Sequence, residues 1–247
     1  MHLWPLLALA GFAAGFVNAI AGGGSLLSFP ALLATGMSPV TANATSTLAL
    51  WPGSLSSVWA YRRFIGEERR RALVLAWPSL VGGLGGSILL LHTSERAFRV
   101  VVPWLILFAC GLLAAQEPLA RWIARRTDGD GRGVPWTLVV VQLLISIYGG
   151  YFGAGIGILM LAAMAIFVPG SLQHANGLKV LFAMLINGMA AIYFFATHAA
   201  SLPASGLMAV ASLVGGYAGA HLAQRLPARL MRWLVIAFGV AVAVRLF

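Results

Sequence analysis

The chain has 247 residues, of which 60% are hydrophobic and only 9% are charged. Soluble domains carry roughly 25% charged residues, so this composition excludes an ordinary soluble protein. Apolar runs of about 18 residues or more recur along the chain, and about 20 apolar residues span a bilayer as a helix. We therefore expect an all-α, polytopic membrane protein embedded in a lipid bilayer.

The net charge of +10 comes from arginines that lie in short segments between the apolar runs. This distribution is typical of cytoplasmic loops of membrane proteins, so it predicts orientation and not nucleic-acid binding. The single cysteine, Cys110, excludes an intrachain disulfide and a cysteine-based metal site. The scattered histidines form no cluster with carboxylates, and we expect no metal, no cofactor and no enzymatic activity.

The predicted elements form two similar sets, residues 1–116 and 134–247, joined by a polar cytoplasmic linker at 117–133. Each set opens with a long apolar stretch that glycines interrupt, and three further helices follow it. The expected stretches and helices are 3–34, 42–61, 72–91 and 98–116 in the first set, and 135–168, 175–197, 205–223 and 231–247 in the second.

The sequence of the second half resembles that of the first at a constant offset of 133 residues, so that position 79, for example, corresponds to position 212. The sequence Ser-Leu-Val-Gly-Gly at 79–83 recurs at 212–216, and Ala-Asn at 42–43 recurs at 175–176. Duplicated apolar halves are common in secondary transporters, which bind their substrate where the halves meet. The repeat therefore predicts a site between the two halves.

The basic residues bear on the topology. Under the positive-inside rule, the arginines at 62–71 and at 121–126 put both segments in the cytoplasm. If each long stretch crosses the membrane once, the halves are parallel and the arginines at 225–232 lie outside. If each stretch enters as a full helix and returns as a short one, the halves are inverted and these basic loops are all cytoplasmic. We favour inverted repeats.

The glycine breaks are followed by apolar segments too short to span a membrane alone, 25–34 and 158–168. Irregular backbone at membrane depth is tolerated only where protein buries it or where it lines a watery cavity. Helix N-termini present free N–H groups and partial positive charge, which suit an anion. The candidate substrate-binding residues around the breaks are Asn18, Gly22, Gly23, Gly24 and Ser25 in the first half, with Gly155 and Gly157 in the second.

Two Gly-x-x-x-Gly pairs, Gly82/Gly86 and Gly215/Gly219, favour a different role. Small residues at this spacing let membrane helices approach closely. We expect these glycines to pack helices together and not to bind cargo.

The six acidic residues lie in or beside loops, whereas Lys179, the only lysine, lies within the predicted helix 175–197. A charge at a helix centre costs about 2.5–3.5 kcal/mol on insertion, which argues for a functional role facing an anion. The alternative is a lysine that extends from near the helix start to the interface. Asn176 and Asn187 fall roughly on the same helix face as Lys179.

Asn43 and Ser46 occupy the repeat positions of Asn176 and Lys179, and His174 immediately precedes Ala175-Asn176. These three residues complete the candidate substrate-binding set. For each hydroxyl and amide, simple hydrogen bonding between helices is the alternative role. The absence of an intramembrane carboxylate favours an anionic or neutral cargo over a cation.

The stretch 14–25, Ala-Gly-Phe-Val-Asn-Ala-Ile-Ala-Gly-Gly-Gly-Ser, with Phe-Pro-Ala-Leu at 29–32 and Ala-Asn-Ala-Thr at 42–45, resembles the sulfite exporter TauE/SafE family. Segments 149–157, 175–179 and 186–188 resemble its second repeat. The resemblance covers essentially the whole chain. It implies a multi-pass carrier of the bacterial inner membrane that exports small sulfur-containing anions such as sulfite or organosulfonates.

The leading hypothesis is thus an alternating-access exporter of small anions, whose oligomeric state, including a homo-oligomer, stays open. An anion channel and a non-transporting membrane assembly factor are the alternatives. An intramembrane hydrolase using Ser25 is disfavoured, because no Gly-x-Ser-x-Gly motif occurs and the repeat has Ile158 at the equivalent position.

Overall fold

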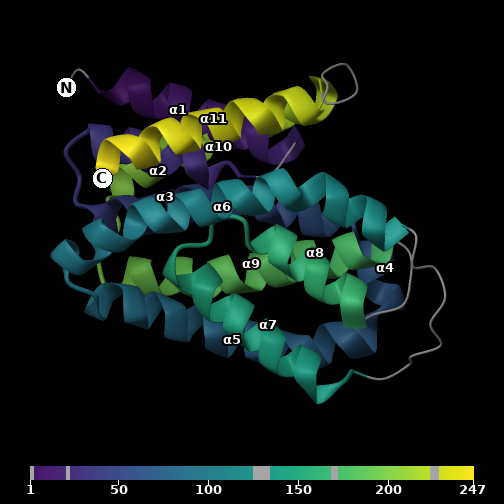
Figure 1. The fold of residues 1–247 in the computed structure, drawn as a ribbon. Coiled ribbons are helices and arrows are strands. Elements are labelled where there is room, and N and C mark those ends of the chain that lie inside the picture. The colour runs from purple at the N-terminus through teal and green to yellow at the C-terminus, as the bar shows by residue number, and fades with distance from the viewer. Residues whose placement is uncertain (1–2, 21–22, 125–133, 168–171, 223–227) are drawn as a thin grey trace.

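The structure, a computed structural model, describes residues 3–20, 23–124, 134–167, 172–222 and 228–247 (Figure 1). Within these segments the regular structure is helical and contains no strand, which confirms the predicted all-α class. The helices are α1 (Trp4–Ile20), α2 (Ser25–Ala34), α3 (Pro39–Ala60), α4 (Arg62–Glu67), α5 (Arg69–His92), α6 (Glu95–Ala124), α7 (Trp136–Tyr151), α8 (Ile156–Phe167), α9 (Leu172–Ala196), α10 (Leu202–Leu222) and α11 (Ala228–Leu246).

Two helix pairs, α1/α2 and α7/α8, are separated by short non-helical breaks. Gly23 lies in the first break with φ of 86°, and Gly153 and Gly155 lie in the second with φ of 81° and 79°. Glycine adopts this left-handed region without the Cβ penalty of other residues, so the chain can turn there. The second break is further fixed because the Tyr148 hydroxyl donates to the carbonyl oxygen of Ala154 at 2.6 Å.

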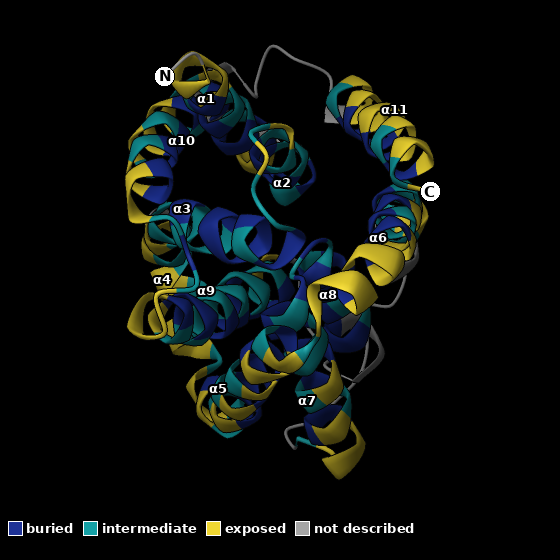
Figure 2. Cartoon of the chain, turned by 90° about the vertical axis from the view of Figure 1, so that its left-hand side faces the viewer, coloured by how far each residue is buried: buried dark blue, intermediate teal, exposed yellow. Residues whose placement is uncertain are grey.

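Helices α3 and α9 pack against each other at the centre of the bundle (Figure 2). Three pairs of helices surround them: α1 with α10, α5 with α7, and α6 with α11. Each of these pairs joins one helix from the first half to one from the second. The interface between the halves is therefore extensive, and the halves do not form separate units.

The Gly-x-x-x-Gly pairs make close helix contacts, which confirms their predicted packing role. A Cβ atom on Gly86 in α5 would lie 2.0 Å from the carbonyl oxygen of Ile147 in α7. A Cβ atom on Gly215 in α10 would lie 2.0 Å from the carbonyl oxygen of Phe12 in α1. The other glycine of each pair would also meet a backbone oxygen, at 2.8 and 2.6 Å.

The basic segments gather at one end of the bundle, which we call the basic end. It comprises α4, the start of α5, the end of α6 and the start of α11, on the right in Figure 1. The start of α1 and the end of α11 lie at the opposite end (Figure 1).

Four helices in the described chain are long and apolar enough to cross a membrane, within α5, α6, α9 and α10. Helix α3 has 22 residues, but its serines, threonines and asparagine make it less apolar. Large apolar side chains lie exposed on the outer helices, including Trp104 at 61% and Val210 at 65%. Such broad apolar surfaces are typical of contact with lipid.

Two helical features differ from the expectation. The short helix α4 was not predicted, because six residues rich in charge carry no periodic apolar signal. Helix α6 continues to Ala124, inside the segment expected as a linker. Tertiary contacts account for the extension, since Leu119 packs on the core and Glu117 pairs with Arg232 of α11 at 3.1 Å.

Candidate functional site

A cavity of about 340 Å³ lies between the halves, lined by α1, α2, α3, α6, α9 and the α7/α8 break. The N-terminal ends of α2 and α8 both reach it. Most of the residues predicted from the sequence lie around this one space. Those that line it are Asn18, Gly23, Ser25, Asn43, Ser46, Gly155, Gly157, Lys179 and Asn187.

The other predicted residues lie elsewhere. Gly22 falls outside the described residues. Gly24 packs α2 against α1, because a Cβ atom there would lie 2.4 Å from the carbonyl oxygen of Ala14. Asn176 does not line the cavity but contacts Lys179, and His174 lies in a separate cluster at the basic end.

Among the described residues that line the cavity, Lys179 is the only cationic side chain, and none is Asp or Glu. Its Nζ donates to Oδ1 of Asn176 at 2.9 Å, one helical turn earlier in α9. Its aliphatic chain passes the start of α8, where a Cβ atom on Gly157 would lie 3.5 Å from Cδ of the lysine. The lysine side chain therefore lies beside the first turn of α8, and none of the described residues that line the cavity carries a carboxylate.

Several polar groups in the cavity have no protein partner in the described chain. The side chains of Asn18 and Asn187 make no hydrogen bond to other described residues, and Oε1 of Gln116 is buried without a hydrogen-bond partner. Gln116 was not predicted, although a glutamine at the end of the apolar run 98–116 is a visible signal. These amides can bind a ligand without breaking an existing bond.

Other polar groups in the cavity are already used between helices. The Asn43 side-chain amide donates to the carbonyl oxygen of Tyr151 at 2.9 Å, and the hydroxyls of Ser46 and Ser28 are 2.6 Å apart. Trp51, which sequence patterns mark only as apolar, lines the cavity and donates from Nε1 to the carbonyl oxygen of Met184 at 3.2 Å. The Asn43 and Trp51 bonds join the two halves around the cavity, whereas the Ser28–Ser46 contact joins α2 to α3 within the first half.

An aromatic cluster closes the cavity on the side away from the basic end. Phe152 lines the cavity and contacts Phe29 and Phe98 edge-on, with ring centroids 5.6 and 6.5 Å apart. Phe98 also contacts Tyr151 at 5.5 Å. We call Phe29, Phe98, Tyr151 and Phe152 the aromatic seal; its three phenylalanines are at most 4% exposed.

The opposite side of the cavity is open. Asn18 and Ala19, at the end of α1, line the cavity and are exposed. Ser54 and Ser57 line it in the last turns of α3, next to α4. The cavity therefore opens toward the basic end.

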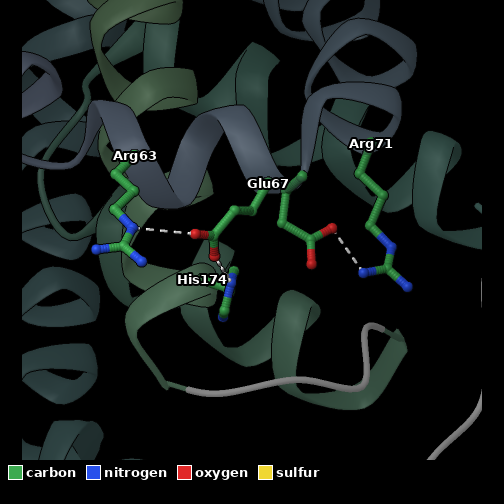
Figure 3. Close-up of polar contacts among 5 residues, drawn as sticks. Arg63, Glu67, Arg71 and His174 are labelled. Carbon is green, nitrogen blue, oxygen red and sulfur yellow. Dashed lines mark hydrogen bonds and ion pairs between the residues drawn. The ribbon is translucent and has the colours of Figure 1, made fainter.

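His174 belongs to an ionic cluster that joins α4 to the start of α9 (Figure 3). Its Nε2 lies 2.7 Å from Oε2 of Glu67, whose other oxygen accepts from Arg63 at 3.3 Å, and its ring contacts Phe64 edge-on. Arg71 pairs with the neighbouring Glu68 at 2.6 Å. The hydrogen bond with His174, aided by Arg63, lowers the pKa of Glu67. In the described residues, no three metal-ligating side chains cluster.

Comparison with known proteins assigns the chain to a family. It is 28% identical to a probable membrane transporter protein of a Sinorhizobium species, over 99% of this chain and 92% of that protein. It is 33% identical to a probable membrane transporter protein of Haemophilus influenzae, over 71% of this chain and 69% of that protein. It is 30% identical to the probable membrane transporter protein YfcA of Escherichia coli K12, over 86% of this chain and 76% of that protein. The family model for the sulfite exporter TauE/SafE matches residues 7–246. The chain is thus a multi-pass membrane protein of the sulfite exporter TauE/SafE family, a family of membrane transporters.

Proposed function

We propose that this transporter carries small anions and binds them in the cavity at Lys179. The observation that carries the proposal is one cation, with no carboxylate, among the described residues that line the cavity. A charge inside a membrane helix is costly and is typically functional. Asn18, Ser25 and Asn187 lie around the same space and can replace part of the water shell of an oxyanion.

The two short helices add to the preference for an anion. Helix α2 begins at Ser25 and helix α8 at Ile156, and both of these residues line the cavity. The first N–H groups of a helix have no partner within it and carry partial positive charge. An anion between the starts of α2 and α8 is therefore attracted by the partial positive charge of both.

We further propose that the halves are inverted repeats that give alternating access to this site. The starts of α3 and α9 (39 and 172), α5 and α10 (69 and 202), and α6 and α11 (95 and 228) each differ by 133. The contacts are reciprocal, since α1 packs on α10 as α7 packs on α5, and α2 packs on α11 as α8 packs on α6. Helix α1 runs toward the basic end and α7 away from it (Figure 1), which favours inversion.

A twofold relation also explains why Trp51 contacts Met184. The two positions differ by 133, so each is the repeat counterpart of the other, and counterparts touch only near an axis that relates the halves. Such an axis in the membrane plane is typical of inverted-repeat transporters, with the substrate site near the midplane.

For the cargo, we propose sulfite or an organosulfonate, exported across the bacterial inner membrane with the basic end in the cytoplasm. The family's name supports sulfur oxyanions. The cavity of about 340 Å³ leaves room for an organic group, and Leu113, Ile156 and Leu161 offer it apolar contacts.

Flux through purified protein in liposomes tests the site. Lys179→Met should reduce anion flux at least about tenfold, the loss of one charge-assisted contact, while Arg99→Met, an exposed cation outside the cavity, should not. Unchanged flux in Lys179→Met would overturn the assigned role. A thermal-shift screen against sulfite, sulfate, thiosulfate, sulfoacetate and simple carboxylates identifies the cargo, because binding stabilises by mass action. Flux that saturates and is accelerated by cargo on the far side distinguishes a carrier from a channel.

A further inference from the structure

We propose that Asn43 and Asn176 are latches of two gates, one at each end of the cavity, and that they close these gates alternately. The inference rests on the proposed carrier function. It assigns to these two asparagines the role of holding the halves in position at each gate. Its first observation is the Asn43 amide of α3, which donates to the carbonyl oxygen of Tyr151 at the end of α7 at 2.9 Å. Asn43 is 3% exposed although it lines the cavity, so little of its side chain contacts water.

The Asn43 bond fixes the aromatic seal. Tyr151 supplies both the carbonyl that accepts this bond and a ring that contacts Phe98 at 5.5 Å. Phe152, the next residue, contacts Phe29 of α2 at 5.6 Å. Holding the end of α7 against α3 therefore holds the rings that close the cavity on the side away from the basic end.

The repeat-related positions at the basic end are open. The offset of 133 relates Tyr151 to Asn18 and Phe152 to Ala19. Where Tyr151 and Phe152 are packed, Asn18 and Ala19 are exposed and line the cavity. The same two positions thus form a closed gate in one half and an open one in the other.

The second latch is disengaged. Asn176 is the counterpart of Asn43, and the equivalent of the Asn43 bond would run from its amide to the carbonyl oxygen of Asn18. In the described chain Asn176 instead bonds within α9, where its Oδ1 accepts from Lys179 at 2.9 Å. The cargo-binding cation and the latch are therefore in direct contact.

Alternation follows from these contacts. An anion that binds Nζ of Lys179 draws the ammonium group away from Oδ1 of Asn176. The Asn176 side chain is then no longer held along α9 and can turn its amide N–H toward α1. Asn176 then donates to the Asn18 carbonyl and closes the basic end, while Asn43 releases Tyr151 and the aromatic seal opens. Asn43 and Asn176 act here as positioning residues, and Lys179 links the cargo to them.

Two single-cysteine reporters distinguish the states in a Cys110→Ala background. Ser57 lines the open side of the cavity, and its repeat counterpart Ala190 is 0% exposed. A membrane-impermeant maleimide should label Ser57→Cys in inside-out vesicles and leave Ala190→Cys unlabelled in right-side-out vesicles. Labelling requires no cargo, so it does not depend on knowing the anion.

Loss of the two latches should affect labelling differently: removing Asn43 should shift it, and removing Asn176 should prevent the anion from shifting it. Asn43→Ala should raise labelling of Ala190→Cys about two- to tenfold, the population shift that one net hydrogen bond provides. Asn43→Leu, which keeps the branched shape and the number of side-chain heavy atoms but lacks the donor, should do the same. Asn176→Ala should keep Ser57→Cys labelled and Ala190→Cys protected, even with the best-binding anion of the thermal-shift screen.

Ser212→Ala is the control, because the Ser212 hydroxyl lies 3.3 Å from the carbonyl oxygen of Ala49 in α3 as well as 2.9 Å from that of Ala209 in its own helix, away from both gates. Labelling in both Asn43 variants that equals this control would overturn the latch. If labelling shifts in Asn43→Ala but anion flux is unchanged in Lys179→Met, the latch stands and the anion site at Lys179 is refuted. If flux is lost in Lys179→Met but labelling does not shift in Asn43→Ala, the anion site stands and the latch is refuted.

Discussion

Gly86 in α5 provides a quantitative test of how tightly the two halves pack. A Cβ atom at this position would lie 2.0 Å from the carbonyl oxygen of Ile147 and 2.7 Å from the amide nitrogen of Tyr151, both backbone atoms. Ordinary contact begins at 3.4 Å, so Gly86→Ala must separate α5 from α7 by about 1.4 Å (3.4 − 2.0). Backbone atoms cannot rotate aside, and we expect a cost near the upper end of overpacking, about 3 kcal/mol.

The adjacent Gly85 is the matched control, because a Cβ atom there meets nothing within 4 Å. Alanine is the better helix former, so Gly85→Ala should leave stability unchanged or slightly raised. At about 2–4 °C per kcal/mol for a chain of this size, the melting temperature of Gly86→Ala in detergent should fall about 6–12 °C below that of Gly85→Ala. Gly215→Ala and Gly216→Ala repeat the comparison in α10, with nearest atoms at 2.0 and 3.8 Å. Equal melting temperatures within each pair would refute the close approach of the helices.

Two further predictions concern the basic end and the cavity. Glu67→Gln should lower the melting temperature at about pH 7. His174 and then Arg63 lower the pKa of Glu67 below its ordinary 4.5, so the wild-type advantage is present above that value and is lost as pH falls through the lowered one. A difference in melting temperature that does not change with pH would contradict this. Asn187→Ala should raise the KM for the proposed anionic cargo about tenfold without changing the melting temperature, since its amide lines the cavity and has no partner in the described chain. A fall in melting temperature with unchanged KM would instead indicate a packing role.

The all-helical class could be predicted because apolar runs of helical length are a local property of the sequence. The short segment expected at 25–34 is helix α2, Ser25–Ala34, since glycine freedom ends one helix and a run of apolar residues begins the next. Helix α4 could not be predicted in this way. It depends on Phe64 and Glu67 contacting His174, which lies 107 positions from Glu67 in the chain.

The roles of individual polar residues were harder to predict than the helices that carry them. Asn43 and Asn187 have the same chemistry and both line the cavity, yet the Asn43 amide bonds a carbonyl 108 positions away and the Asn187 amide has no partner in the described chain. Only the tertiary arrangement separates these roles. His174 is different, because helix geometry alone argues against its predicted place in the binding site. It precedes Asn176 by two positions, which correspond to about 200° of rotation, so the two side chains lie on opposite faces of the helix.

The energetics of the aromatic seal restrict how a carrier built on these halves can move. Burying one phenylalanine is worth about 1.5–3 kcal/mol, so exposing three to water would cost roughly 5–9 kcal/mol. A minor state that supports turnover lies only a few kcal/mol above the major one. Phe29, Phe98 and Phe152 therefore cannot all be exposed when the seal opens. Phe98 contacts Phe152 and Tyr151, whereas Phe29 belongs to the short helix α2. A movement that separates α2 from the α7/α8 break, and leaves Phe98 packed on Tyr151 and Phe152, opens the seal at the contact between Phe29 and Phe152 alone.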